Sequence, residues 1–144
     1  MDIAALLMWV VTALGGFSML GVWIKRGGPQ GGSSSRLPVP VVFGHFGLAA
    51  AGLVVWIVYV ITDKDALAWT AFGLLVPVAL LGFTMLARWI PVYQARATTP
   101  AADPQGRGAP AERYFPVPVV AGHGLSAVTT VVLVLLTALG IGGS

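Results

Sequence analysis

Four long apolar segments limit what this chain can fold into. They cover about residues 3–24, 38–61, 66–90 and 116–139, and each has the roughly 20 residues that a helix needs to cross a bilayer core. Only 9% of the 144 residues are charged, against about a quarter in soluble domains. Backbone polar groups in lipid must be bonded within their own segment, which favours helices. The sequence therefore predicts a single all-α domain, residues 1–144, that is an integral membrane four-helix bundle.

Residue usage excludes several kinds of chemistry. The chain has no cysteine, so disulfides, thiolate catalysis and iron-sulfur clusters are excluded. The five acidic residues lie at ends or in loops, and no Ser/His/Asp or carboxylate-pair arrangement is present. The net charge is +3, but the bases are not interleaved with aromatic residues, so we expect no nucleic-acid partner. These features disfavour a stand-alone enzyme.

One motif occurs twice. Pro-Val-Pro-Val-Val-Phe-Gly-His at residues 38–45 recurs as Pro-Val-Pro-Val-Val-Ala-Gly-His at residues 116–123, with seven of eight positions identical. The preceding apolar segments also correspond, with Gly-Phe-Ser-Met-Leu at residues 16–20 and Gly-Phe-Thr-Met-Leu at residues 82–86. We infer that a two-helix hairpin has been duplicated.

The duplication predicts a symmetric arrangement. The first copy would cover about residues 3–61 and the second about residues 66–139. Two spans return the chain to its starting side, so a pseudo-two-fold axis along the membrane normal would relate the copies. His45 and His123 each follow the second proline of their motif by five residues. We therefore expect the two rings to face each other at one level of the bundle.

These two residues are the only histidines in the chain, and an ionisable ring in a membrane span usually has a function. Neutral imidazoles presented from opposite sides are suitable axial ligands for a six-coordinate haem, which transfers electrons and has no open position. The sequence predicts one haem b, with His45 and His123 as its metal ligands, between the second and fourth apolar segments near the cytoplasmic side.

Other candidate cofactor-binding residues accompany the histidines. Gly44 and Gly122 beside the ligands, and small residues further along the same faces, would leave room for a flat macrocycle; the small residues are Ala49, Gly52, Ala127 and Thr130. A metal-bound histidine usually donates its other N–H to an acceptor. The matched hydroxyls of Ser18 and Thr84, or else a backbone carbonyl one turn back, would accept it. Phe17 and Phe83 would pack on the porphyrin, and Arg36 and Arg113 would reach the propionates.

The basic residues predict the orientation. Seven of the eight lie toward one face, in or beside loops 25–37 and 91–115, and only Lys64 lies opposite. The positive-inside rule makes those loops cytoplasmic and puts both termini outside. Little lysine and much alanine, glycine, valine and arginine suggest a bacterium with a GC-rich genome, and hence its inner membrane.

Three further expectations concern single positions. Trp23 and Trp89, at the cytoplasmic ends of the first and third segments, would be interfacial anchors. Pro77 would bend the third helix, and Pro91 would end it.

In its four spans and its histidines on parallel helices, the chain resembles small four-helix membrane cytochromes b, including the cytochrome b561-like and membrane-anchor types. The resemblance implies a mono-haem cytochrome with His45 and His123 as axial ligands, because the di-haem members need four. Besides the lipid bilayer, its partners would be a quinone and an oxidoreductase subunit or a second copy of the chain. Two alternatives stay open: a haem-free scaffold or anchor subunit of a larger complex, and a small histidine-dependent transporter.

Overall fold

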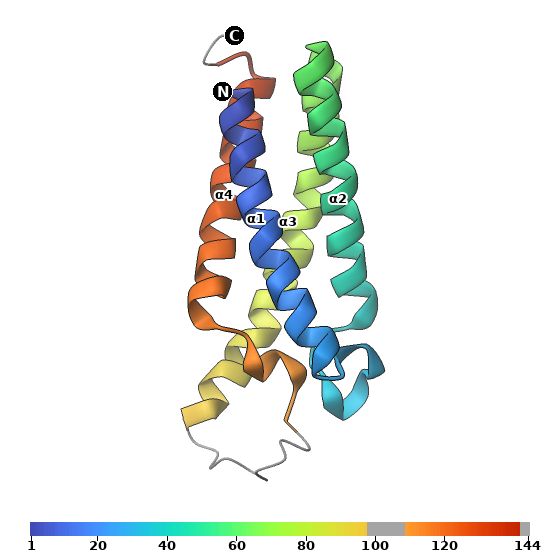
Figure 1. Cartoon of the computed structure of the whole chain (residues 1–144), viewed down its shortest axis with the longest axis vertical. Coiled ribbons are helices and arrows are strands. Elements are labelled where there is room, and N and C mark those ends of the chain that lie inside the picture. Colours follow the sequence, from blue (N-terminus) through green and yellow to red (C-terminus); the bar gives the residue numbers. More distant parts are fainter. Residues whose placement is uncertain (98–108, 142–144) are drawn as a thin grey trace.

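Four long helices form the protein in the computed structural model, which describes residues 1–97 and 109–141 (Figure 1). They are α1 (Asp2–Lys25), α2 (Val39–Thr62), α3 (Asp65–Gln94) and α4 (Val117–Ala138). Each is long and apolar enough to span a membrane. Short 3-10 turns lie in the connections: η1 (Gly28–Gln30), η2 (Gly32–Ser34), η3 (Ala95–Ala97) and η4 (Ala111–Tyr114). The predicted all-α class with four membrane-length helices is confirmed.

Proline positions the starts of the two helices that carry histidine. Pro38 and Pro116 are the N-caps of α2 and α4, with extended backbone at φ −65° and −67°. Pro40 and Pro118 follow in the first turn, where a missing N–H costs nothing because that donor has no partner within the helix. The two histidines therefore lie equally far from the starts of their helices.

The third helix is longer than the sequence predicts. We expected it to end at Pro91, but α3 continues to Gln94. A proline disturbs the turn before it, through its ring and its missing N–H, and does not prevent the residues after it from staying helical. The helix also continues through Pro77, and a bend at that position stays a prediction.

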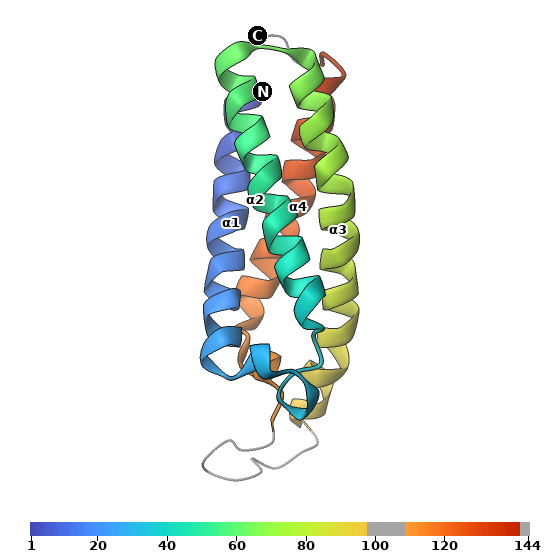
Figure 2. The ribbon, with the colours of Figure 1, turned by 90° about the vertical axis from the view of Figure 1, so that its right-hand side faces the viewer.

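The helices pack as two pairs. α2 packs mainly on α3, and α4 packs mainly on α1. α2 and α4 lie on opposite sides of the bundle in Figure 1, and α1 and α3 do so after a quarter turn, in Figure 2. The two helices that carry histidine are therefore diagonal neighbours. Both termini lie at one end, and the connections before α2 and α4 lie at the other, which we call the loop end (Figure 1).

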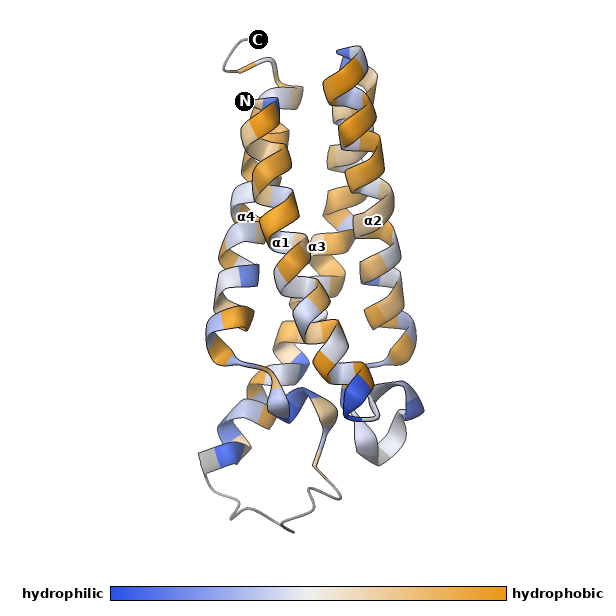
Figure 3. Cartoon of the chain, in the orientation of Figure 1, coloured by the Kyte–Doolittle hydropathy of each residue, from blue (hydrophilic) through white to orange (hydrophobic). Residues whose placement is uncertain are grey.

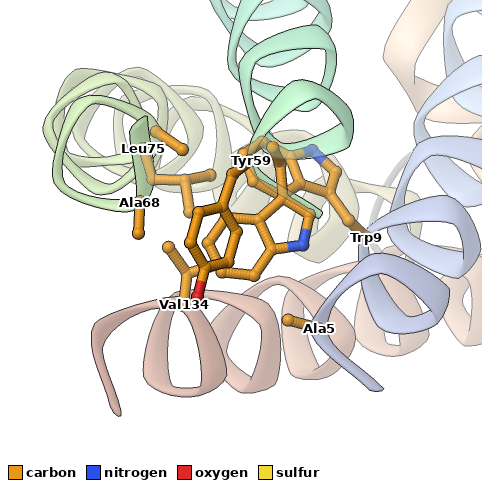
Figure 4. Close-up of a cluster of buried hydrophobic side chains, with 8 residues drawn as sticks. Ala5, Trp9, Tyr59, Ala68, Leu75 and Val134 are labelled. Carbon is orange, nitrogen blue, oxygen red and sulfur yellow. The ribbon is translucent and has the colours of Figure 1, made fainter. Parts of the chain in front are cut away.

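Two clusters of buried side chains form the core. The cluster toward the termini is aromatic at its centre, where Trp9, Trp56 and Tyr59 pack together (Figure 4). The second cluster lies at the loop end and consists of Trp23, Leu37, Val42, Trp89, Ala111 and Phe115. Apolar residues cover most of the helix surfaces, and hydrophilic residues gather at the loop end (Figure 3). Along α2 and α4 the histidines lie between the two clusters.

The prediction that Trp23 and Trp89 are interfacial anchors is wrong. Their side chains are only 1% and 8% exposed and belong to the loop-end cluster. An anchor keeps its indole N–H in the headgroup region, whereas here the connections supply the acceptors. Trp23 Nε1 donates to Ser35 Oγ at 2.9 Å, and Trp89 Nε1 donates to the Glu112 carbonyl at 3.2 Å.

Candidate functional site

The two histidines meet inside the bundle. The ring centroids of His45 on α2 and His123 on α4 are 6.3 Å apart, and the ring planes are inclined by 59°. Both side chains are half-buried. This geometry agrees with the expectation that the two rings face each other at one level of the bundle.

Each ring is oriented by a backbone carbonyl of the neighbouring helix. His45 Nδ1 lies 2.9 Å from the Val78 carbonyl on α3, and His123 Nδ1 lies 2.9 Å from the Thr12 carbonyl on α1. A carbonyl only accepts, so Nδ1 must carry the proton in both rings. In a neutral imidazole this leaves Nε2 as the atom with a free lone pair, which is the atom that binds a metal.

Glycines give the rings access to those carbonyls. Gly16 and Gly82 each follow the accepting residue by four positions, so a side chain there would project back over the carbonyl. A Cβ at Gly16 would lie 3.2 Å from His123 Cε1, and one at Gly82 would lie 3.3 Å from His45 Cε1. Gly15 is equally close to His123, with a Cβ distance of 3.3 Å. A larger residue at these positions would therefore push against the ring.

The two halves of the site use corresponding positions. Val78 follows Thr12 by 66 residues, and Gly82 follows Gly16 by the same interval. The two hydrogen bonds therefore have the same register, although one joins α2 to α3 and the other joins α4 to α1. Sequence reasoning did not select Thr12, Val78, Gly15, Gly16 or Gly82 as site residues. The recurrence of Gly-Phe-Ser/Thr-Met-Leu at residues 16–20 and 82–86 was the available signal.

Ser18 and Thr84 do not have the role that we expected first. Ser18 Oγ donates to the Gly15 carbonyl and Thr84 Oγ1 to the Leu80 carbonyl, each at 2.9 Å within its own helix. Both side chains are exposed. The acceptors of the two histidines are instead the backbone carbonyls of Val78 and Thr12 on the neighbouring helices.

The small residues along α2 do not leave a continuous space. A Cβ at Gly52 would lie 3.0 Å from Cζ2 of Trp9, so the indole of α1 already occupies the room that we expected for a macrocycle. Nearer the histidine, Gly44 has Leu81 Cδ1 at 3.8 Å from such a Cβ, and Gly122 has nothing within 4 Å. The packing of the chain therefore does not require glycine at 44 or 122, and their role toward a cofactor stays a prediction.

Two other pairs of predicted residues lie away from the rings. Phe17 and Phe83 are 56% and 61% exposed, and Phe17 packs edge-on against Phe46 at 5.4 Å between centroids. Arg36 and Arg113 lie at the loop end, where the Arg36 side chain is exposed and that of Arg113 is half-buried. Their contacts with a porphyrin and its propionates stay predictions.

The donor set and the comparisons complete the picture of the site. Within the part of the chain that the structure describes, no three residues of the types His, Cys, Asp and Glu lie together as a metal site. Comparisons with protein-family models, with curated proteins and with solved structures found no match to this chain. Function must therefore be inferred from the geometry of the two histidines.

Proposed function

We propose that this chain is a membrane-bound b-type cytochrome that holds one haem b between His45 and His123 and transfers electrons. The separation of the rings supports this most directly. Two metal–nitrogen bonds of about 2 Å, with about 1 Å from each nitrogen to its ring centre, add up to about 6 Å. The ring centroids are 6.3 Å apart. The spacing therefore suits one metal atom bound by both rings.

The donor chemistry favours a macrocycle over a bare ion. Two imidazoles alone leave at least half of the coordination shell of a metal ion empty, and the described residues offer no His, Cys, Asp or Glu as a third ligand nearby. A porphyrin supplies the remaining nitrogen ligands itself. With His45 and His123 as its protein ligands, haem would supply a one-electron centre that is closed to small ligands.

The residues around the rings have supporting tasks in this proposal. The Thr12 and Val78 carbonyls hold the Nδ1 protons, so that Nε2 of each ring is available and more basic. Gly16 and Gly82 keep the sides of the rings free of side chains. Along α2 and α4, an apolar cluster lies on either side of the rings. Together these features hold two neutral ligands in fixed positions.

The duplication and the orientation belong to the same proposal. The matched register of the two hydrogen bonds supports a duplicated hairpin with a pseudo-two-fold axis along the membrane normal. Six basic residues near the loop end support an inner-membrane protein with loops 25–37 and 91–115 in the cytoplasm and both termini outside. These are Lys25, Arg26, Arg36, Arg88, Arg96 and Arg113. A quinone and an oxidoreductase subunit or a second copy are the proposed partners.

A haem-free scaffold or anchor subunit is the alternative that one observation favours. The hydrogen bond of His45 also joins α2 to α3, and that of His123 joins α4 to α1, so each bond connects the two helices of one pair. Polar contacts of this kind are common between membrane helices and contribute about 0.6 kcal/mol on average. Under this alternative the histidines serve packing alone.

Substitution by asparagine separates the two functions. The asparagine amide N–H takes the place of Nδ1–H and preserves the bond to the carbonyl, but it presents no nitrogen in the place of Nε2. We expect purified wild-type protein to show a Soret band, a reduced-minus-oxidised α band and about one haem per chain. His45→Asn and His123→Asn should lose this six-coordinate spectrum and keep the melting temperature of the apoprotein. Wild-type protein without a Soret band, or variants with unchanged spectra, would contradict the haem proposal.

A further inference from the structure

One buried carboxylate joins the segments that lead into α2 and α4. The Glu112 side chain is 0% exposed. Its Oε1 accepts a hydrogen bond from the Arg36 backbone N–H at 2.6 Å, and its Oε2 accepts one from Ser35 Oγ at 2.9 Å. Residues 35 and 36 precede α2, and Glu112 lies in η4, which precedes α4. The two connections are therefore fastened to each other across 76 residues of sequence.

Two tryptophans attach this junction to the other helices. Trp23, near the end of α1, donates from Nε1 to Ser35 Oγ at 2.9 Å. Trp89 of α3 donates from Nε1 to the Glu112 carbonyl at 3.2 Å. Segments before α2 and α4 thus contact the loop-end parts of α1 and α3 through a single network. The network joins all four helices at one end of the bundle.

The junction lies at a matched distance from both histidines. Leu37 precedes His45 by eight residues, and Phe115 precedes His123 by eight residues. Both Leu37 and Phe115 are buried in the loop-end cluster. α2 packs mainly on α3 and α4 mainly on α1, so α2 and α4 belong to different pairs, and the junction of their leading segments is one of the contacts that connect the two pairs.

We propose that Glu112 is a positioning residue that sets the spacing of the His45 and His123 rings by fastening residues 35–37 to η4. The importance of Glu112 for cofactor binding rests on the proposed function, whereas its effect on the distance between the two rings does not. In residues 1–97 and 109–141 no lysine or arginine forms an ion pair with Glu112. Its carboxylate is held by the Ser35 hydroxyl and the Arg36 backbone N–H. Removing it leaves the Arg36 N–H without this acceptor and Ser35 Oγ with only the longer contact to the Leu37 carbonyl, at 3.4 Å.

The absence of cysteine allows the helix distance to be measured directly. Gly47 on α2 and Leu125 on α4 each follow a histidine by two residues, and both are exposed. A Cβ at Gly47 meets no atom within 4 Å, and Leu125 is 73% exposed, so labels fit at both positions. We would place spin labels at Gly47→Cys and Leu125→Cys in lipid nanodiscs and measure their distance by pulsed dipolar spectroscopy.

The variants are Glu112→Ala, Glu112→Gln and Ser35→Ala, with Asp63→Asn as the matched control. Asp63 is an exposed acid at the opposite end, with φ of 51°, which asparagine tolerates. We expect one narrow distance in the parent and in Asp63→Asn, and a broadened or shifted distance in Glu112→Ala and Ser35→Ala. Glu112→Gln should be intermediate, because its amide oxygen still accepts one hydrogen bond. Should Glu112→Ala not fold, the other two variants still test the proposal.

The haem-loaded protein gives a second readout. We expect Glu112→Ala to release haem to apomyoglobin about tenfold faster than the parent, since hydrogen bonds to a charged group are lost. The electron paramagnetic resonance g-values, which report the angle between the ligand planes, should also shift. Unchanged label distances and g-values with only a lower melting temperature would overturn the positioning role. A parent that binds no haem would overturn the proposed function instead, and the label distances would still decide the role of Glu112.

Discussion

Gly82 lies directly against the imidazole of His45, where a Cβ would come within 3.3 Å of Cε1. The ring reaches past this glycine to the Val78 carbonyl, one turn earlier in α3. A side chain on a helix points back over the preceding turn, so any larger residue at position 82 would cover that carbonyl. The lack of a side chain at Gly82 on α3 thus allows the hydrogen bond that orients the His45 ring on α2.

Replacing Gly82 should therefore disturb His45. We expect Gly82→Val to displace the ring, to break its hydrogen bond and to destabilise the protein by about 1–3 kcal/mol. Haem content should fall with it. Gly73→Val is the control on the same helix, because a Cβ at Gly73 meets nothing within 4 Å. Unfolding in detergent and the haem-to-protein ratio measure the two effects, and equal losses in both variants would contradict the close contact.

The contact between Trp9 and Gly52 predicts a coupled pair. Gly52→Leu should overpack the site because a Cβ there already lies 3.0 Å from the indole, and Trp9→Ala should cost about 3–5 kcal/mol through the cavity that it leaves. In the double variant the leucine would occupy part of that cavity, so the combined loss should be smaller than the sum. Unfolding free energies from a denaturing-detergent titration measure this, and strict additivity would argue against the contact.

Trp23 and Trp69 should differ in their exposure to lipid. The Trp23 side chain is 1% exposed, whereas that of Trp69 is 46% exposed. In brominated lipids, Trp69→Phe should remove fluorescence that the lipid quenches, and Trp23→Phe should remove fluorescence that the lipid does not quench. The comparison uses each variant in brominated and ordinary bilayers. Strong quenching of the Trp23 contribution would restore the interfacial anchor that the structure excludes.

The proposed orientation can be tested with single cysteines, since the chain has none. Lys64→Cys lies in the turn between α2 and α3, and Gln30→Cys lies in the connection after α1. Both native residues are exposed. With the basic loops inside, a membrane-impermeant maleimide added to intact cells should label position 64 and not position 30. After lysis both should react, and the reverse pattern in intact cells would invert the topology.

Local sequence was sufficient for the helices but not for the contacts between them. The predicted helix bounds differ from the observed bounds by at most four residues, because hydropathy and the prolines at positions 38 and 116 act over a few neighbouring residues. The prediction that α3 ends at Pro91 was wrong because a proline affects mainly the turn before it. The prediction that Trp23 and Trp89 are exposed at the interface was wrong because distant connections supply the acceptors of their indole N–H groups.

The partners of the histidines show the same division. Equal distances from the helix starts were enough to predict that His45 and His123 lie at one level. Whether each ring bonds to Ser18 and Thr84 or to a carbonyl depends on how α1 and α3 are rotated about their axes. Hydropathy does not report that rotation when a helix is apolar on all sides, as these four helices are.

The sequence by itself determined four membrane-length helices, the prolines that start two of them, and the equal depth of the two histidines, because each of these depends on a few consecutive residues. Only the tertiary structure decided which helices pair, that Trp9 fills the space at Gly52, and that Glu112 joins two connections 76 residues apart. The physical reason is that such contacts depend on the rotation and spacing of whole helices, which side chains from all four helices determine together.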